Sequence, residues 1–496
     1  MDDLPTADAR SLATSIRRLF EDSHRLLADT SSELVAAITG HIGCPMSQVP
    51  NVTARFEGWE HVNVHRGLES FLAEHSPGAE WFGIAGNRMH QSLMDMLTGA
   101  MHGGYELGAV DYVTLATGPD SAEEAVQFGL VRTVAPGGAP VVLAVQGPQE
   151  DRGEFRCAVQ VLAADRETAT LAREEVERQV RAHDVFRGQV LAFGISEHRG
   201  NQLLTFLPRP SLRPEDVVLP DGVLRAIERH VVRSASQSER LRAHGQHLKR
   251  GLLLYGPPGT GKTHTVRYLL GRLESTVIVL SGVAMFRFLR TATALARRLE
   301  PAVVVVEDVD LIAEDRNFTT SGSPALFELL NEMDGIGSEA DVTFVLTTNR
   351  VEMMEQALAE RPGRVDLAME VPLPDAECRE RLLRLYASDV DLDLTDASAI
   401  VTASDGVTAS FVKELVRRAV LIALDEQPSA ARVRLDESTI TAALGELMDE
   451  RQALTRSILG GGGPADRQRA TVSRAPAAVR QAFAVPTGAS PGVSPA

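Results

Sequence analysis

The hydrophobic pattern divides the chain into stretches of different character. In the first fifty or so residues the apolar positions recur at helical spacing, as in residues 16–20 and 34–38, which predicts helices. From Trp59 to about Pro210 apolar runs typical of strands are mixed with an amphipathic helical stretch, Arg166 to Arg181. The predicted strands lie at residues 112–115, 141–145, 158–162, 190–193 and 203–207. We therefore expect residues 1–210 to form a helical segment and an α+β domain that selects a partner or substrate.

The pattern changes after Pro208, Pro210 and Pro214, which indicate a linker. Over residues 216–374 short apolar strands alternate with helices, which predicts an α/β fold with a parallel sheet and helices on both faces. Residues 375–459 keep only helical periods and predict an all-helical unit. Residues 460–496 begin with four glycines and have no apolar period, so we expect a disordered tail rich in Gly, Pro and Ala.

Composition limits the classes of function. The chain has 496 residues, 44% apolar and 24% charged, which is typical of a globular protein with several domains. The net charge of −17 makes nucleic acid an unfavourable partner. No apolar stretch approaches the roughly 20 residues that cross a bilayer, and the chain starts with acidic residues, so we expect a cytoplasmic protein without a membrane segment. Cys44, Cys157 and Cys378 lie too far apart in sequence to suggest a zinc site.

A glycine-rich segment follows the predicted strand at residues 251–255 and precedes a predicted helix. The order strand, GxxxxGK[ST], helix is that of a phosphate-binding loop. Its glycines let backbone N–H groups approach a phosphate, and the helix N-terminus adds positive potential. Lys262 is one of only three lysines in the chain, and we expect it to meet the phosphate oxygens while Thr263 binds magnesium. The residues expected to bind the nucleotide are Gly256, Pro257, Pro258, Gly259, Thr260, Gly261, Lys262, Thr263 and His264.

Polar residues follow two further predicted strands. Glu307 and Asp308 come directly after the apolar run 302–306, where carboxylates would project into the ligand crevice of a parallel sheet. We expect Glu307 to hold Mg²⁺ and Asp308 to deprotonate the attacking water. Asn349 follows the strand at 342–348 and could orient this water. Farther along, Arg361 and Arg364 flank a Pro-Gly turn and could neutralise charge on a phosphoryl group.

Together these motifs resemble an AAA+ ATPase over about residues 216–459. Residues 256–263 are similar to its Walker A motif, 303–308 to Walker B, Asn349 to sensor-1, and residues 331–335 through 364–366 to the second region of homology. The resemblance implies ATP and Mg²⁺ as ligands, a helical lid at 375–459, and adenine contacts by Ala409 and Ser410. It also implies that Arg361 and Arg364 are arginine fingers reaching the nucleotide of a neighbouring subunit, so that the active unit is a homo-oligomeric ring, usually a hexamer.

The sequence departs from the family pattern in three places. Most members have Asp then Glu at the end of Walker B, whereas Glu307 and Asp308 reverse this order. Residues 280–288 lack the aromatic, apolar and glycine triplet that threads polypeptide; Phe286 could substitute, or could belong to one face of the next helix. The end of the chain lacks the tyrosine motif by which proteasome-activating relatives dock.

The pattern therefore predicts a Mg²⁺-dependent ATP hydrolase that remodels, disassembles or translocates an unidentified protein partner. Two alternatives stay open at this point. A nucleotide-controlled scaffold with slow turnover fits the reversed carboxylates, and a DNA remodeller fits less well because the chain is acidic. Among weaker signals, His61 and His65 are four residues apart but lack the glutamate of HExxH, Gly103 to Gly108 indicates a turn, and Trp59 and Trp81 are expected in the core.

Overall fold

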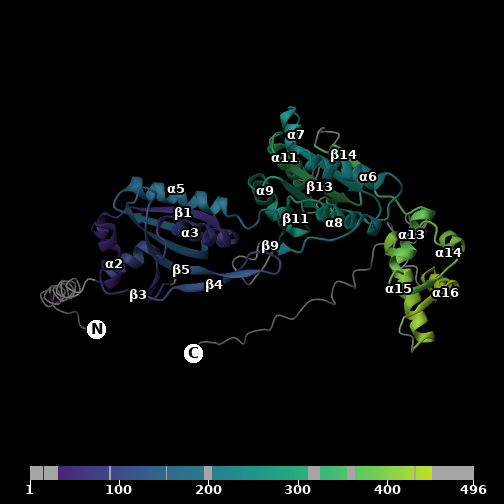
Figure 1. The fold of residues 1–496 in the computed structure, drawn as a ribbon, viewed down its shortest axis with the longest axis horizontal. Coiled ribbons are helices and arrows are strands. Elements are labelled where there is room, and N and C mark those ends of the chain that lie inside the picture. The colour runs from purple at the N-terminus through teal and green to yellow at the C-terminus, as the bar shows by residue number, and fades with distance from the viewer. Residues whose placement is uncertain are drawn as a thin grey trace, which may run out of the picture.

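The computed structural model describes residues 15, 32–88, 91–151, 154–194, 204–310, 324–352, 354, 364–428 and 432–448. The elements form three units that lie in a row in Figure 1, in the order of the chain. Within the described ranges no helix has the length and apolar character needed to cross a membrane. The predicted tail at 460–496, the helical pattern at 16–20 and the last part of the helical unit, 449–459, lie outside the described residues.

The first unit is an antiparallel sheet with helices on both faces. Its helices are α2 (Glu33–Ile42), α3 (His61–His75), α4 (Leu93–Ala100), α5 (Arg166–Ala182) and the 3-10 helices η1 (Met46–Gln48) and η2 (Gly58–Glu60). Its strands are β1 (Asn51–Glu57), β2 (Trp81–Ala85), β3 (Glu106–Gly108), β4 (Asp111–Ala116), β5 (Ala122–Val134), β6 (Pro140–Asp151) and β7 (Glu154–Ala163). The sheet order is β1-β7-β6-β5-β2-β3, and β4 pairs with β5.

Strand alternation explains why both faces of this sheet carry a core. Val141, Leu143 and Val145 of β6 pack toward the helices α3 and α5, whereas Val142 and Ala144 pack toward α2 and α4. Successive side chains of a strand point to opposite faces, so a continuous apolar run such as 141–145 requires cover on both. The predicted strands at 112–115, 141–145 and 158–162 and the predicted helix at 166–181 correspond to β4, β6, β7 and α5.

The second unit is a mostly parallel sheet of order β14-β10-β13-β12-β11-β8-β9. Its strands are β8 (Val190–Phe193), β9 (Leu204–Leu207), β10 (Arg250–Tyr255), β11 (Thr276–Leu280), β12 (Ala302–Val306), β13 (Val342–Thr348) and β14 (Leu367–Glu370). Its helices are η3 (3-10, Pro214–Asp216), α6 (Val223–Glu228), η4 (π, Arg229–Arg233), α7 (Ser238–Ala243), α8 (Lys262–Arg272), α9 (Val283–Arg298) and α11 (Pro324–Gly335). Every residue of β12 and β13 is buried, as expected for strands covered on both faces.

The strands β8 and β9 belong to this second sheet, although the sequence pattern placed them before the predicted boundary near residue 210. Val190 of β8 pairs with Val277 of β11 in a parallel register, and the ring of Phe193 stacks on Phe288 of α9 at 5.1 Å. The prolines that suggested a boundary interrupt the chain only after β9. Which sheet a strand joins depends on tertiary pairing, which the apolar pattern of one strand does not encode.

The third unit is a helical bundle with one short ladder. It contains α13 (Ala376–Tyr386), β15 (Asp391–Asp393), α14 (Ser398–Ala403), α15 (Ala409–Glu426), β16 (Arg434–Asp436) and α16 (Glu437–Met448). The expectation of helices alone therefore missed β15 and β16, which pair in parallel with Leu392 opposite Leu435. Each strand has three residues, too few for an alternating pattern to be detected.

The first two units share a buried apolar junction. Trp59 of η2 lies with its ring centre 5.5 Å from that of Phe186 and 6.1 Å from that of Phe193. Val62 of α3, Leu115 of β4 and the second unit's α9 contribute to the same core cluster. Because a tryptophan buried between two units is removed from water only when they are packed together, this contact favours one fixed arrangement.

One arginine adds a polar contact to this junction. Arg298, the last residue of α9, forms ion pairs with Glu60 and with Asp184, the latter at 2.9 Å, and its guanidinium lies 5.7 Å from the centre of the Trp59 ring. Glu60 is only 6% exposed. A buried carboxylate needs such a partner because desolvation otherwise penalises its charge.

Replacing Arg298 by alanine should therefore weaken the junction. We expect Arg298→Ala to lower the free energy of unfolding by about 2 kcal/mol, because hydrogen bonds to charged groups contribute roughly that much and Glu60 would lose its partner. Urea denaturation followed by tryptophan fluorescence measures this, since Trp59 lies at the junction. Arg297→Ala is the matched control, because within the described residues the guanidinium of Arg297 hydrogen-bonds only to the Gly335 carbonyl oxygen, at 3.5 Å. Equal losses in the two variants would contradict the assignment.

Candidate nucleotide site

The predicted phosphate loop connects β10 to α8, and its glycines adopt backbone conformations that other residues avoid. The φ angles of Gly256, Gly259 and Gly261 are +143°, +78° and +108°. A Cβ atom at Gly256 would also lie 2.3 Å from the carbonyl oxygen of Val371, so a side chain has no room there. The loop geometry therefore explains the glycine spacing, and α8 begins at Lys262 directly after it.

Lys262 is buried against this loop. The residue is only 6% exposed. Its ammonium group donates hydrogen bonds to the carbonyl oxygens of Gly256 at 2.8 Å and Pro257 at 2.9 Å. Burial lowers the pKa of Lys262, and the charges of Asp308 and Asp310 act in the opposite direction. The loop thus holds one positive charge beside the backbone N–H groups that would meet a phosphate.

Thr263 and Glu307, the two predicted magnesium ligands, lie together. Burial, and then the charge of Asp308, raise the pKa of Glu307, while the neighbouring Thr263 side chain lowers it. A hydroxyl and a carboxylate are the oxygen ligands that Mg²⁺ prefers, so the residues present fit this ion.

Asp308 has an unusual backbone for a residue with a side chain. Its φ angle is +52°, in the left-handed region, and it is the one non-glycine residue with positive φ in the described part of the chain. Its backbone N–H donates to the hydroxyl of Thr347 at 2.9 Å. Thr347 belongs to the neighbouring strand β13, so the turn that carries Asp308 is attached to the sheet.

Asp310 is a residue to which the sequence analysis gave no role. It is 9% exposed and accepts hydrogen bonds from the Thr348 hydroxyl and the Asn349 backbone N–H, both at 3.0 Å. Its second oxygen lies 3.4 Å from the Asn349 side-chain nitrogen. Asp310 therefore fixes the position of the predicted sensor Asn349, and only the pairing of β12 with β13 brings the two residues together.

The third unit contacts the phosphate loop through the start of α15. The backbone N–H of Ser410 donates to the Gly259 carbonyl oxygen at 3.1 Å. A Cβ atom at Gly259 would lie 3.1 Å from the Ser410 hydroxyl and 3.2 Å from that of Thr408. Ala409 follows the Thr408 cap and is buried. The structure thus brings Ala409 and Ser410 to the loop, while their contact with adenine stays a prediction.

His264 and Arg364 make other contacts than those predicted for a ligand. The His264 ring nitrogen Nε2 lies 2.9 Å from the Asp216 carbonyl oxygen in the linker before α6. Arg364 is 7% exposed, pairs with Asp334 of α11, and has its pKa lowered by burial. Arg361 lies outside the described residues. The roles of His264, Arg361 and Arg364 stay predictions.

Arg364 lies at the far end of β10 from the phosphate loop. Its carbonyl oxygen would be 2.1 Å from a Cβ atom at Gly251, near the start of the strand. The loop follows Tyr255 at the strand's other end, and strands rise about 3.3 Å per residue, so the separation is on the order of 15 Å. Arg364 therefore lies too far from the phosphate loop of its own chain to contact a nucleotide bound there.

The histidines singled out in the first unit do not form a metal site. His61 is fully buried, its Nε2 lies 2.9 Å from the Val126 carbonyl oxygen, and burial lowers its pKa to about 4. Of the turn predicted at Gly103 to Gly108, Gly103 and Gly104 lie in a turn and a bend, whereas residues 106–108 form strand β3. Trp59 is buried as expected, and Trp81 is partly buried.

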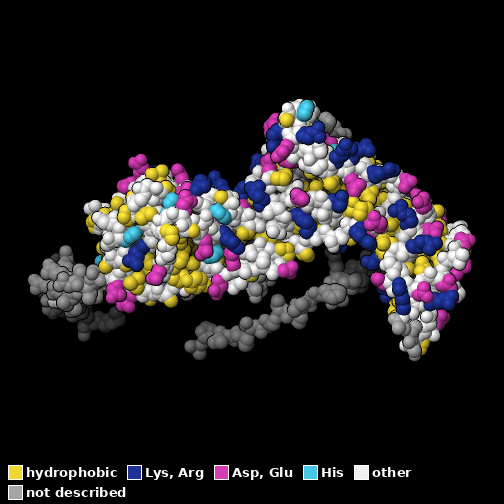
Figure 2. Space-filling model, viewed as in Figure 1, with side chains coloured by type: hydrophobic (Ala, Val, Ile, Leu, Met, Phe, Trp, Pro, Cys, Tyr) yellow, Lys and Arg dark blue, Asp and Glu magenta, His cyan; other side chains and the backbone are white. Residues whose placement is uncertain are grey.

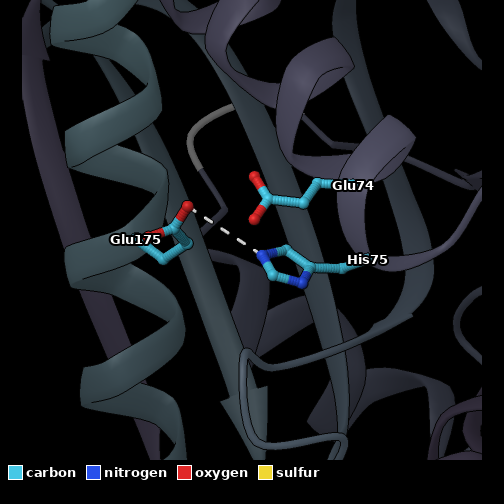
Figure 3. A group of neighbouring side chains, drawn as sticks. All are labelled: Glu74, His75 and Glu175. Atoms are coloured by element: carbon cyan, nitrogen blue, oxygen red, sulfur yellow. Dashed lines mark ion pairs between the residues drawn. The ribbon is translucent and has the colours of Figure 1, made fainter.

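Among the described residues, Glu74, His75 and Glu175 are the one group whose ligand atoms converge enough for a metal ion. Figure 3 shows Glu175 on α5 facing Glu74 and His75 on α3, with an ion pair of 3.9 Å between His75 and Glu175. The Gln179 amide donates to Glu74 at 2.7 Å and to Glu175 at 2.9 Å, and Arg178 lies 2.5 Å from Glu175. The Gln179 amide thus satisfies both carboxylates by hydrogen bonds and Arg178 supplies a positive charge beside them, so the group acts as a polar contact between α3 and α5.

Comparison with known proteins covers the second unit most closely. The family model described as "ATPase family associated with various cellular activities (AAA)" matches residues 252–373. A proteasome-activating nucleotidase 2 of Halobacterium salinarum is 27% identical over 279 residues, 53% of this chain and 67% of that protein. A proteasome-activating nucleotidase of Methanocella arvoryzae is 32% identical over 216 residues, which are 41% of this chain and 51% of that protein. An ATP-dependent zinc metalloprotease FtsH 2 of Symbiobacterium thermophilum is 31% identical over 261 residues, which are 50% of this chain and 42% of that protein.

The chain thus spans between two fifths and two thirds of the length of these relatives. The matched range of the family model contains the phosphate loop, Glu307, Asp308 and Asn349, the same residues that the fold gathers at one edge of its parallel sheet. The chain therefore carries an ATPase module of the AAA+ family.

Proposed function

We propose that this protein binds ATP with Mg²⁺, hydrolyses it to ADP and phosphate, and uses the cycle as a ring of copies to remodel a protein partner. The observation that carries the proposal is the convergence of four groups at one sheet edge. These are the phosphate loop with Lys262, the neighbouring side chains of Thr263 and Glu307, the turn of Asp308, and Asn349 held by Asp310. Each group matches one requirement of phosphoryl transfer.

The chemistry divides among these residues. The loop N–H groups and the Lys262 ammonium bind the phosphate oxygens and align the triphosphate. Thr263 and Glu307 hold Mg²⁺, which supplies neutralisation of phosphate charge when bound. Asp308 accepts a proton from the attacking water, and Asn349 orients that water through its amide. The Asp carboxylate is one methylene shorter than the usual Glu, so we expect the same reaction at a lower rate.

Two contacts could transmit movement at the nucleotide site to the flanking units. The bond from Ser410 to Gly259 attaches the helical unit, which we propose to be the lid, to the phosphate loop. The Arg298 pairs attach the N-terminal unit to α9 of the ATPase unit. Movement of the loop between ATP and ADP states would therefore shift both flanking units.

The arrangement of the arginines supports a ring. Since Arg364 lies at the opposite end of β10 from its own loop, a role for it in catalysis would require the nucleotide of a neighbouring copy and release of its ion pair with Asp334. Arginines supplied in this way raise rates by about 10³ to 10⁵ in related phosphoryl transfers. We propose a homohexamer, and expect the specific activity per chain to rise with protein concentration.

A protein is the best supported partner. The relatives include two proteasome-activating nucleotidases and an ATP-dependent metalloprotease, and a proteasome and a protease both act on proteins. Figure 2 shows Lys and Arg side chains interspersed with Asp and Glu on the visible face, and the net charge is −17. A nucleic-acid binder needs a continuous basic surface, which this mixture does not offer on that face.

Steady-state hydrolysis with Mg²⁺ tests the proposed activity. We expect Lys262→Ala to lose nucleotide binding and turnover, and Asp308→Asn to bind ATP but to hydrolyse it about 10² to 10⁴ times more slowly, the usual contribution of a general base. Lys413→Ala is the control, because Lys413 is an exposed lysine on α15. Equal, near-zero rates in wild type and both site variants would instead favour the slow-turnover scaffold.

Asp310 should act as a positioning residue. We expect Asp310→Ala to lower kcat on the order of 10²-fold with little change in KM for ATP, because Asn349 loses its fixed place. Asp310→Asn keeps one oxygen that can accept from the Asn349 N–H and should recover part of the rate. If Asp310→Asn and Asp310→Ala were equally slow, the hydrogen bond would not be the cause.

The raised pKa of Glu307 predicts opposite effects of one variant on stability and on activity. The folded protein favours protonated Glu307, so ionisation costs stability above the folded pKa, and this cost disappears below the ordinary value of 4.5. Glu307→Gln should therefore melt at a higher temperature than wild type at pH 7 without Mg²⁺, and at the same temperature near pH 4, while its hydrolysis is impaired. A lower melting temperature at pH 7 would refute this electrostatic account.

A further inference from the structure

The N-terminal sheet has one face that its helices cover only in part. The helices α3 and α5 pack on the first face. On the other face α2 and α4 pack over a cluster that includes Val142, Ala144 and Leu162. Toward β1 the same face carries polar side chains instead, and these line a cavity of about 390 Å³ that opens to the surface. We call this cavity the β1–β7 groove.

Strand register arranges the floor of the groove in three rows. Thr53 of β1 lies opposite Gln160 of β7 in the first row. In the second row Arg55 lies opposite Ala158, and Ala158 opposite Gln146 of β6. In the third row Glu57 lies opposite Arg156, and Arg156 opposite Gln149. The small side chain of Ala158 at the centre leaves the floor hollow, and Gln91 and Ser92 before α4 form the wall.

The lining determines which ligands fit. It contains two guanidinium groups, Arg55 and Arg156, and only Ala158 and Cys157 lack a strongly polar side chain. Glutamine side chains carry both a carbonyl acceptor and an amide donor, which is what a peptide backbone requires. Within the lining, Gln160 already accepts from the Asn51 amide at 2.7 Å and Gln146 donates to Gln149 at 3.0 Å, so a peptide would use the remaining capacity of these groups. Among the described residues no aromatic side chain lines it, so this lining offers neither the platform on which nucleic-acid bases stack nor the apolar walls of a typical small-molecule pocket.

The spacing of the rows selects an extended chain. Rows two residues apart along a strand are separated by about 7 Å, which is also the separation of alternate side chains in an extended peptide. Arg55 and Arg156 occupy neighbouring rows on adjacent strands. Carboxylates at positions i and i+2 of a peptide lying along the strands would therefore each meet one guanidinium, and arginine–carboxylate pairs are strong and geometrically specific.

Glu57, the acidic residue of the third row, leaves this complementarity in place. Glu57 is 4.0 Å from Arg156, and both side chains are more than one third exposed, so their pairing is weak. Arg55 is exposed as well. An incoming carboxylate can thus compete with Glu57 for Arg156.

We propose that the β1–β7 groove binds an extended, acidic segment of the protein partner, with carboxylates at alternate positions. This inference rests on the proposed function, for which it supplies the partner-binding surface. The groove also adjoins the junction: β1 ends at Glu57, and η2, which follows, carries Trp59 and Glu60 against α9. Glu57 in the third row is therefore two residues from Trp59 and three from Glu60, the residues that contact the ATPase unit.

Fluorescence anisotropy with labelled peptides tests the inference on the full chain without nucleotide. The probe is a fluorescein-labelled peptide of alternating Asp and Ser, and its two controls are a peptide with the same composition but all Asp at one end and a Lys-Ser peptide. We expect the alternating peptide to bind at least about tenfold more tightly than either control, and its affinity to fall as salt is raised. No binding of the alternating peptide, or equal binding of the Lys-Ser peptide, would overturn the proposal.

Variants locate the binding. Ala158→Leu should fill the hollow, and Arg55→Glu should reverse one charge at an exposed site, each weakening the alternating peptide at least about tenfold. Arg181→Glu is the matched charge reversal on α5, where the side chain is 69% exposed, and should bind like wild type. Circular dichroism verifies that each variant folds. Unchanged affinity in both groove variants would overturn the proposal, as would complete displacement of the peptide by millimolar inorganic phosphate, because a simple anion site would then suffice.

The two proposals can fail separately, because this assay contains no nucleotide. Hydrolysis without binding of the alternating peptide would refute the groove and leave the ATPase proposal standing. Peptide binding by a chain that does not hydrolyse ATP would refute the ATPase proposal and leave a peptide-binding surface.

Discussion

The parallel pairing of β10, β13 and β12 is the constraint on which the nucleotide site depends. Because parallel strands end at the same sheet edge, the loop after β10, the carboxylates after β12 and Asn349 after β13 arrive together although nearly one hundred residues separate the first from the last. Burial of every residue of β12 and β13 keeps this edge in place. Side-chain bonds then refine it: Thr347 holds the Asp308 turn, and Asp310 holds Asn349.

At the same sheet edge two charged side chains are buried at an electrostatic cost that a bound ligand could remove. Lys262 is buried with a lowered pKa and Glu307 with a raised one, so each charge is penalised in the folded protein. Phosphate oxygens would stabilise the ammonium group, and a divalent cation would stabilise the carboxylate. Ligand binding would thus be favoured by removal of these penalties, which agrees with the observation that functional sites concentrate shifted pKa values.

Contacts between units suggest how such a site communicates. Among the described residues, the loop meets the helical unit through the backbone bond from Ser410 and the nearby Thr408 and Ser410 side chains, whereas the N-terminal unit meets α9 through an apolar core and the Arg298 pairs. The first contact is small and the second is extensive. We infer that the helical unit responds directly to the nucleotide, and that the N-terminal unit moves together with the ATPase sheet.

Sequence patterns predicted those parts of the fold and of the nucleotide site whose signal lies within a short stretch of the chain. The phosphate loop combines glycines, a lysine and a helix start within eight residues, and the strands 141–145 and 158–162 and the helix from 166 have clear periods, all of which the structure contains. Signals that depend on tertiary pairing were missed. Asp310 acts only because β12 lies beside β13, β8 and β9 join a sheet formed mostly by later residues, and the β1–β7 groove exists only when strands 100 residues apart pair.

The proposed function requires a nucleoside triphosphate held between Lys262 and a metal ion bound near Thr263 and Glu307. Isothermal titration calorimetry of the wild-type chain with ATP, with and without Mg²⁺, measures this directly. We expect saturable binding of one ATP per chain that is markedly tighter with Mg²⁺ than with EDTA. Folded protein that takes up neither ATP nor ADP in the presence of Mg²⁺ would contradict it.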